Sequence, residues 1–232
     1  MCRLLLVQSR QPLNPAVYLE PFADACRASR EYQGHGWGIT SHTTDPSATW
    51  DRYRTLTPIW DDDLAQLGTT RSFLAHARSA FRDEDIAVEN NMPFVAGRWS
   101  YGFNGELRGV RVRAPGRTGA ARIWNMIQRA QTSAGLSMHE AIERTVAVLV
   151  RQSVYVRAMN IFITDGENAL VHSSFNESPD YFTLHHCSTG NDDVRIVSSE
   201  PFALPAHGAS SAEETPRWIP VPNHSTMAWQ TA

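Results

Sequence analysis

The stretch TGAARIWNMIQRAQTSAGLSMHEAIERTVAVLV, residues 118–150, holds two helical patterns in the middle of the chain. The first pattern covers residues 118–131. The second begins with a capping box, Ser137-Met138-His139-Glu140, and continues to residue 150 with apolar residues at helical spacing. These two helices separate two groups of predicted strands, and that arrangement decides the fold class.

Strands are predicted on both sides of the helix pair. Each is a short apolar or alternating run bounded by turn residues. They cover residues 3–8, 37–40, 48–53, 72–78, 99–103, 156–164, 169–174, 181–186, 194–198, 218–221 and 225–229, and a further helix covers 15–29. Strands, two helices and more strands, without regular βαβ alternation, indicate a mixed α+β fold with two sheets and helices outside them.

The composition limits the class of protein. The chain has 232 residues, of which 42% are hydrophobic and 19% charged, and a formal net charge of -3. It is too apolar for a disordered chain, and its charge gives no basic surface for nucleic acid. No apolar run approaches the roughly 20 residues of a membrane helix, and the N-terminus lacks a signal-peptide core. We therefore expect a cytoplasmic protein that binds neither nucleic acid nor a membrane, with one large domain or two small ones.

No metal and no cofactor are expected. The three cysteines are widely spaced and form no C-x-x-C pair, and no Gly-rich loop connects a strand to a helix. Asp61-Asp62-Asp63 is interpreted as the acidic first turn of a helix, and not as a metal site. His185 and His186 would point to opposite faces of a strand, so they cannot share a metal ion.

Cys2 is the leading candidate for a catalytic residue. Removal of the initiator Met would make it the first residue of the chain. A free α-amine has a pKa of about 7.7 to 8.0, so it can accept the thiol proton near neutral pH without a His or Asp partner. With 3 cysteines in 232 residues, the probability that any given position is a cysteine by chance is about one in eighty. The position of Cys2 alone therefore does not decide between a catalytic and an accidental cysteine.

Two further features suit acyl-transfer chemistry. Asn104-Gly105 is either a plain hairpin turn or an oxyanion hole, in which a side-chain amide and a backbone N–H bind the same oxygen. Arg78 is either a solvated cation at the end of a strand or a bidentate hydrogen-bond donor to a substrate carboxylate.

Seven short motifs occur in an order that resembles a known family. None is specific alone, but together with the second-position cysteine they cover nearly the whole chain. They are MCRLL (1–5), GHGWG (34–38), FLAHARSA (73–80), ENNMPF (89–94), GRWSYGFNG (97–105), NIFITDG (160–166) and VSSEPF (197–202). The chain resembles the class II, or N-terminal nucleophile (Ntn), glutamine amidotransferases. Within them it is most similar to a short stand-alone subgroup that includes the ergothioneine-pathway γ-glutamyl hydrolases.

The resemblance implies a fold and a set of roles. The fold is a four-layer αββα sandwich of the Ntn-hydrolase type, formed by residues 1–232 as a single domain without metal or cofactor. Cys2 is then the nucleophile and its α-amine the base, and Asn104 and Gly105 form the oxyanion hole. Arg78 binds the α-carboxylate of a glutamyl group, with Trp37 and Ser79 as further substrate-binding residues.

The chain departs from the family where the substrate's amino group binds. The family usually has Thr-Asp-Ser-Glu at the start of its first central helix, and that Asp binds the α-ammonium of glutamine. Here the residues are Thr118-Gly119-Ala120-Ala121. Loss of the partner of a desolvated ammonium costs roughly 3 to 5 kcal/mol. Phe103 and Met92 replace two further histidines that are usual in the family.

These observations predict an amidohydrolase or amidotransferase that acts through a Cys2 thioester. Its expected substrate is a small γ-glutamyl-type amide, modified or conjugated, and not free glutamine. Two alternatives stay open: a glutaminase subunit that delivers ammonia to a separate synthase, and a catalytically silent homologue that binds a partner. A homo-oligomer also stays open.

Overall fold

The computed structural model describes residues 1–42, 50–189, 193–204 and 217–230. Its strands are β1 Arg3–Leu13, β2 Trp37–His42, β3 Asp51–Thr55, β4 Thr70–Ala77, β5 Phe94–Ala96, β6 Trp99–Arg108, β7 Tyr155–Thr164, β8 Asn168–Ser173, β9 His185–Thr189, β10 Val194–Ser198, β11 Ile219–Pro220 and β12 Ser225–Gln230. Its α-helices are α1 Ala16–Ala28, α2 Gly119–Ala134, α3 Met138–Gln152 and α4 Pro179–Phe182.

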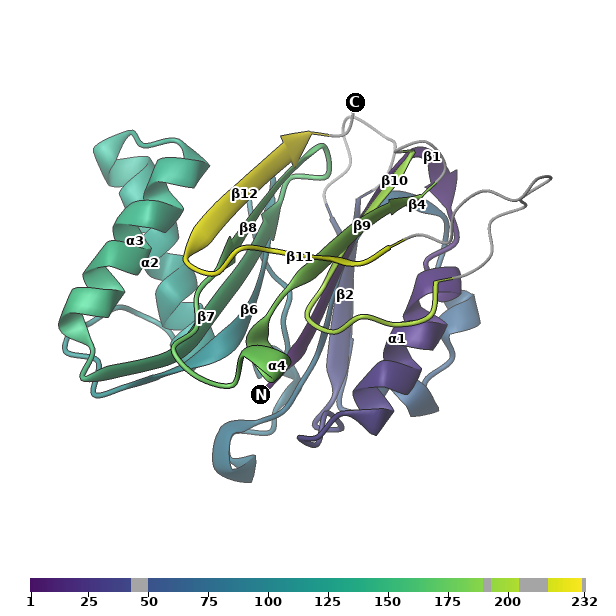
Figure 1. The fold of residues 1–232 in the computed structure, drawn as a ribbon, viewed down its shortest axis with the longest axis horizontal. Helices are drawn as coiled ribbons and strands as arrows, with labels where there is room; N and C mark the ends of the chain where they lie inside the picture. Colours follow the sequence, from purple (N-terminus) through teal and green to yellow (C-terminus); the bar gives the residue numbers. More distant parts are fainter. Residues whose placement is uncertain (43–49, 190–192, 205–216, 231–232) are drawn as a thin grey trace.

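The strands form two antiparallel sheets that lie face to face (Figure 1). The seven-stranded sheet has the order β11-β9-β10-β1-β4-β2-β3, and the five-stranded sheet has the order β12-β8-β7-β6-β5. Helix α1 covers the outer face of the first sheet, and α2 and α3 cover the outer face of the second (Figure 1). This is the four-layer αββα sandwich, so the predicted fold class is confirmed.

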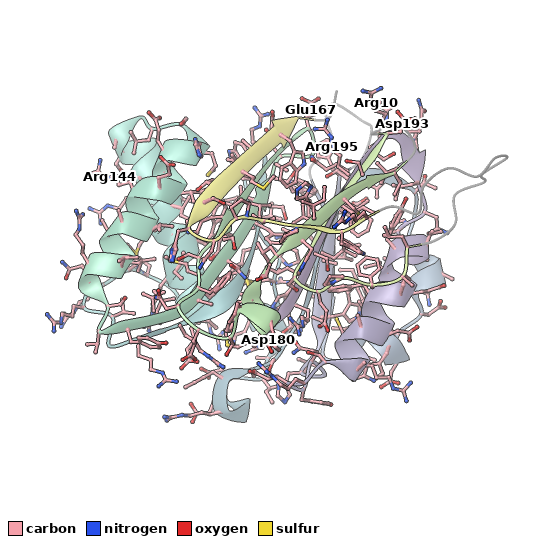
Figure 2. The ribbon with its side chains drawn as sticks, in the orientation of Figure 1. Arg10, Arg144, Glu167, Asp180, Asp193 and Arg195 are labelled. Atoms are coloured by element: carbon pink, nitrogen blue, oxygen red, sulfur yellow. The ribbon has the colours of Figure 1, made fainter. Side chains whose placement is uncertain are left out.

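Alternating side chains along each strand join the four layers into one structure. On β1, Leu5 and Val7 belong to the cluster beneath α1, whereas Leu4 and Leu6 belong to the cluster between the sheets. Phe162 of β7 meets Leu4 and Leu6 from the opposite sheet. Side chains fill the space between layers, whereas charged residues such as Arg144 and Asp180 lie on the outside (Figure 2).

The helix pair that decides the fold forms as predicted. Thr118 caps α2 by accepting the N–H of Ala121 at 3.2 Å. Ser137 and Glu140 form the predicted capping box at the start of α3. Each helix buries one apolar stripe against the five-stranded sheet, which is the usual source of helix stability in a domain.

One predicted strand is wrong. Residues 181–186 were expected to form a strand, but Tyr181 and Phe182 end the short helix α4, and β9 begins at His185. Pro179 explains the difference, because proline suits the first turn of a helix, and the helix that it begins includes Tyr181 and Phe182. Both aromatic side chains are buried.

The expectation for Asp61–Asp63 is also wrong. These residues connect two short 3₁₀ helices, Ile59–Asp61 and Leu64–Gln66, and begin no α-helix. The Asp62 carboxylate accepts the indole N–H of Trp37 at 2.7 Å, and Asp63 accepts the N–H of Ala65.

Several strand bounds also differ from those predicted. Strand β1 runs on to Leu13, and β11 has two residues only. The predicted strand 48–53 corresponds to β3, and its residues 48 and 49 lie outside the described residues.

Neither a spanning helix nor a metal-binding cluster occurs in the part of the chain that the structure describes. None of its helices is long and apolar enough to cross a membrane. No group of three or more His, Cys, Asp or Glu side chains within 1–42, 50–189, 193–204 and 217–230 is placed to hold a metal ion.

Replacing Phe162 by Ala should weaken the contact between the sheets. Phe162 is fully buried, so its loss leaves a cavity and should lower the free energy of unfolding by about 3–5 kcal/mol. Urea unfolding followed by circular dichroism measures this change. Val150→Ala, at a side chain that is 53% exposed on α3, is the control and should change stability by about 0.5 kcal/mol or less. Equal effects of the two variants would contradict the inter-sheet role of Phe162.

Candidate active site

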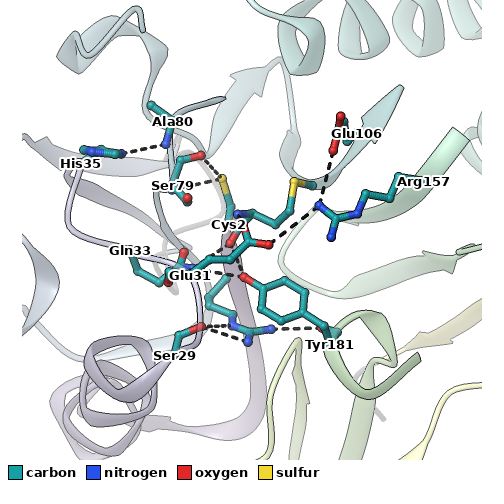
Figure 3. A network of polar contacts seen from close by, with 12 residues as sticks. Cys2, Ser29, Glu31, Gln33, His35, Ser79, Ala80, Glu106, Arg157 and Tyr181 are labelled. Carbon is teal, nitrogen blue, oxygen red and sulfur yellow. Dashed lines mark hydrogen bonds and ion pairs between the residues drawn. The ribbon is translucent and has the colours of Figure 1, made fainter. Parts of the chain in front are cut away.

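Cys2 lies directly before β1, at the end of the seven-stranded sheet. The pairing of Arg3 with Ala77 places it beside the segment that follows β4. Its Sγ accepts the N–H of Ser79 at 3.4 Å and lies 3.5 Å from the Ser79 carbonyl oxygen (Figure 3). Burial raises the pKa of the Cys2 thiol, while the nearby N-terminal ammonium, the Ser79 N–H and the Arg78 guanidinium act to lower it. The thiol therefore needs a base that removes its proton.

A cavity of about 860 Å³ opens beside the thiol. Its volume lies in the upper part of the range for drug-sized ligands. The predicted site residues that line it are Cys2, Arg78, Ser79 and Gly105. The loop that precedes α2 and the first turn of α2 form its far wall, and both include arginines. The cavity can therefore hold an amide considerably larger than glutamine.

Gly105 presents its backbone at the edge of β6. Its partner in β7, Met159, donates its N–H to Ser174 on the far side, so the Gly105–Met159 pair is not hydrogen-bonded. The Gly105 N–H consequently points to the other edge of β6. Strand β5 covers that edge only at residues 99–101, so it does not reach Gly105. A Cβ at position 105 would lie 2.2 Å from the Ala158 carbonyl oxygen, so only glycine fits there.

Asn104 lies one residue earlier on β6, and its side chain is buried. Neither atom of its side-chain amide has a hydrogen-bond partner among the described residues. An unpaired buried amide is costly, and it is a donor available for a ligand oxygen. Asn104 does not itself line the cavity, so the structure brings Gly105 to the cavity wall and leaves Asn104 behind it.

Arg78 is buried and lines the cavity. Its guanidinium donates to the carbonyl oxygens of Asp85 and Ala87 and to Asn91 Oδ1, at 2.8, 3.2 and 3.2 Å. These three bonds leave two of its five N–H groups for a ligand. Arg78 can therefore bind a carboxylate while it holds the loop 85–91 in place.

Comparison with solved structures identifies the fold. A glutamine aminotransferase class-II domain protein from Silicibacter pomeroyi matches with a TM-score of 0.64 and 16% identity over 98% of this chain and 94% of that one. Glutamine phosphoribosylpyrophosphate amidotransferase from B. subtilis matches at 0.61 and 14% over 85% of this chain but 42% of its own. A predicted glutamine amidotransferase from Pseudomonas aeruginosa matches at 0.56 and 14% over 99% and 98%. The chain has the class II glutamine amidotransferase fold.

No protein-family model matches the sequence, and neither does any curated protein. Solved structures with this fold match the chain at identities of only 13–16%. The likeness therefore lies in the fold and not in the sequence.

Trp37 does not reach the cavity in this class II glutamine amidotransferase fold. Its side chain is 1% exposed and lies beneath α1, on the outer face of the seven-stranded sheet. The expected contact between Trp37 and substrate is therefore corrected, because strand alternation turns this residue away from the side that carries Cys2. Ser79 does line the cavity, and its contact with the Cys2 thiol is made by the backbone.

Four residues that lie around the site have no role in it assigned from the sequence. His35 Nδ1 accepts the N–H of Ala80 at 2.9 Å and so fixes the segment that holds the thiol. Glu31, Gln33 and Tyr181 surround the N-terminal residue (Figure 3). Tyr181 is 180 positions from Met1 in the sequence, so no local pattern could have predicted this contact.

His76 is a buried, neutral histidine in the cavity wall. Burial, reinforced by the Arg78 charge, lowers its pKa to about 3 from an ordinary 6.5. Neither ring nitrogen has a hydrogen-bond partner among the described residues. In the unfolded chain the same imidazole takes up a proton below about pH 6.5, so protonation favours unfolding as the pH falls from 6.5 towards 3.

The variant His76→Gln should lose this pH dependence. Between pH 6.5 and 5 the wild-type chain should lose about 2 kcal/mol of unfolding free energy through His76 alone. Urea unfolding at both pH values measures the difference. His139→Gln, at the exposed start of α3, is the control and should retain the wild-type slope. A parallel loss of stability in His76→Gln and wild type would contradict the assignment.

Proposed function

We propose that the chain is an amidohydrolase or amidotransferase with Cys2 as nucleophile, acting on a γ-glutamyl-type amide. The observation that carries the proposal is the position of the Cys2 thiol on the wall of a large cavity that also presents the Gly105 N–H edge and the Arg78 guanidinium. A cytoplasmic location, and the absence of nucleic-acid and membrane partners, stay predictions from the composition.

The proposed reaction begins once Met1 has been removed. The Cys2 α-amine takes the thiol proton, and the sulfur electron pair forms a bond to the amide carbonyl carbon. The carbonyl oxygen becomes an oxyanion that the Gly105 N–H on the cavity wall stabilises. Asn104, whose unpaired amide lies behind that wall, is the second donor once its side chain turns towards the cavity. The ammonium then returns its proton to the leaving nitrogen as the C–N bond breaks. Water, or an acceptor amine, finally releases the acyl group from the thioester.

The far wall of the cavity disfavours a free α-ammonium group at the first turn of α2, whereas Glu84, Asp85 and Glu106 line other parts of the cavity. The first turn of α2 contains no acidic residue, and a Cβ at Gly119 would meet nothing within 4 Å. Arg117 and Arg122 line the cavity on either side of Gly119. Together with the positive end of the helix dipole they disfavour a cation there. This supports a substrate whose amino group is absent, acylated or bound elsewhere, and it supports hydrolysis or acyl transfer over ammonia delivery from glutamine.

The nucleophile is tested with Cys2→Ala. The wild-type enzyme should lack Met1 by intact mass and should hydrolyse glutaryl-p-nitroanilide, an amide that keeps the carboxylate and lacks the amino group. Cys2→Ala should lose this activity, because no other thiol reaches the cavity in the described part of the chain. Cys187→Ala, at a buried thiol of β9, is the control and should remain active. Turnover by Cys2→Ala, or an active enzyme that retains Met1, would overturn the mechanism.

Specificity is tested with Gly119→Asp. Wild type should prefer glutaryl-p-nitroanilide to γ-glutamyl-p-nitroanilide, and these two amides differ only in the amino group. The new carboxylate has open space and can pair with the ammonium, so the preference should shift towards the γ-glutamyl amide by about tenfold or more in kcat/KM. Gly68→Asp, at another glycine with open space, is the control and should leave the preference unchanged. An unchanged preference in Gly119→Asp would locate amino-group recognition elsewhere.

A further inference from the structure

The N-terminal residue is held by three side chains from two distant parts of the chain, Glu31 and Gln33 after α1 and Tyr181 in α4 (Figure 3). The Met1 ammonium forms an ion pair with Glu31. The Met1 carbonyl oxygen accepts one hydrogen bond from Gln33 Nε2 and one from the Tyr181 hydroxyl, each 2.7 Å long. These contacts surround the peptide bond that must be cut to free the Cys2 amine.

Both hydrogen-bond donors are buried and are themselves held in place. Gln33 is 0% exposed and Tyr181 is 4% exposed. Gln33 Nε2 also donates to the Glu31 carbonyl oxygen at 2.8 Å and lies 3.3 Å from the Tyr181 hydroxyl. Arg3 stacks over the Tyr181 ring at 4.0 Å and donates to its carbonyl oxygen. The hydroxyl therefore occupies a fixed position whether or not Met1 is present.

Removal of Met1 leaves these groups next to the new α-amine. The Met1 carbonyl oxygen is only about 2.2 Å from the Cys2 nitrogen across the peptide bond. Cutting that bond removes the acceptor of the Gln33 and Tyr181 hydrogen bonds and leaves the amine nitrogen beside them. Glu31 loses its ammonium partner at the same time. A buried site with several unpaired polar groups is then available for one amine.

We propose that Glu31, Gln33 and Tyr181 form an amine pocket that binds the Cys2 α-amine of the mature chain and points its lone pair at the thiol. The Tyr181 oxygen and the Glu31 carboxylate each accept one N–H of the amine, and Gln33 fixes both of them. With two N–H groups bound, the lone pair is left to take the Sγ proton. The three are positioning residues for the general base, and this inference rests on the proposed function.

Further charges face the pocket from the neighbouring elements. Arg157 of β7 lies 3.8 Å from Glu31 and also pairs with Glu106 and Glu177. Arg3, which pairs with Glu200, lies against Tyr181, and Arg78 lies near the thiol. Glu31 is the carboxylate that pairs with the terminal ammonium. It should raise the pKa of the amine, because it stabilises the charged form.

The test measures the rate at which iodoacetamide alkylates Cys2, followed by intact mass as a function of pH. Each protein is made behind a leader whose proteolytic removal leaves Cys2 first, so Met1 processing plays no part. Tyr181→Phe and Gln33→Leu should slow alkylation at pH 7 by about fivefold to tenfold. Tyr53→Phe removes a hydroxyl that bonds to Asp62 on the far face of the sheet and should react like wild type.

Glu31→Gln supplies a readout that a purely structural role would not change. Loss of the carboxylate should lower the pKa of the amine, so alkylation should persist to a pH about one unit lower than in wild type. Wild-type rates in Tyr181→Phe together with an unchanged pH midpoint in Glu31→Gln would overturn the amine pocket alone. If wild-type Cys2 reacts no faster than the buried Cys26 and Cys187, the nucleophile assignment itself fails, and with it the proposed function.

Discussion

The antiparallel pairing of β1 with β4 is the constraint on which the rest of the site depends. It sets Arg3 opposite Ala77, and so brings the residue before one strand beside the residues after the other. The Cys2 thiol then meets the backbone of Ser79, in a segment that His35 also holds by accepting the N–H of Ala80. Since β1 is the central strand, with β10 on its other side, the proposed nucleophile lies directly before a strand that is paired along both edges.

The alternation of side chains along each strand decides which residues lie between the two sheets. It also buries polar groups there without hydrogen-bond partners, which costs stability. Cys2 lies on the same side of β1 as Leu4, and His76 on the same side of β4 as Leu74, so all face the second sheet. His76 and Asn104 are buried there without partners among the described residues. Each such group costs about 1–3 kcal/mol. Unpaired polar groups in an otherwise apolar layer are typical of a region kept for binding.

Sequence periodicity predicted the parts of the structure that local interactions determine. The capping box of α3, the stripes of α2 and α3, and most strands follow from neighbours in the sequence, and Cys2, Arg78 and Gly105 follow from short motifs. The contacts behind the proposed amine pocket could not be predicted, because Gln33 and Tyr181 meet Met1 only after the chain has folded. Trp37 belongs to the GHGWG motif, yet the alternation of side chains along its strand directs it to the α1 side of the sheet. A motif alone does not specify on which face of a sheet a residue lies.

Chemistry and specificity are built on separate elements of this fold. The proposed nucleophile lies just before β1, and its backbone partner lies in the segment after β4. The groups around its amine come from the residues after α1 and from α4. The far wall of the cavity comes from the loop before α2 and the first turn of that helix. A change of one residue at that turn therefore alters the charge that the substrate meets without disturbing the thiol or its base. Gly119, where the family that the sequence resembles usually has Asp, is such a position, since space is open there and the helix keeps its Thr118 cap. Under the proposed function the chain thus retains acyl chemistry at Cys2, while the other end of its cavity no longer offers a carboxylate to an ammonium group.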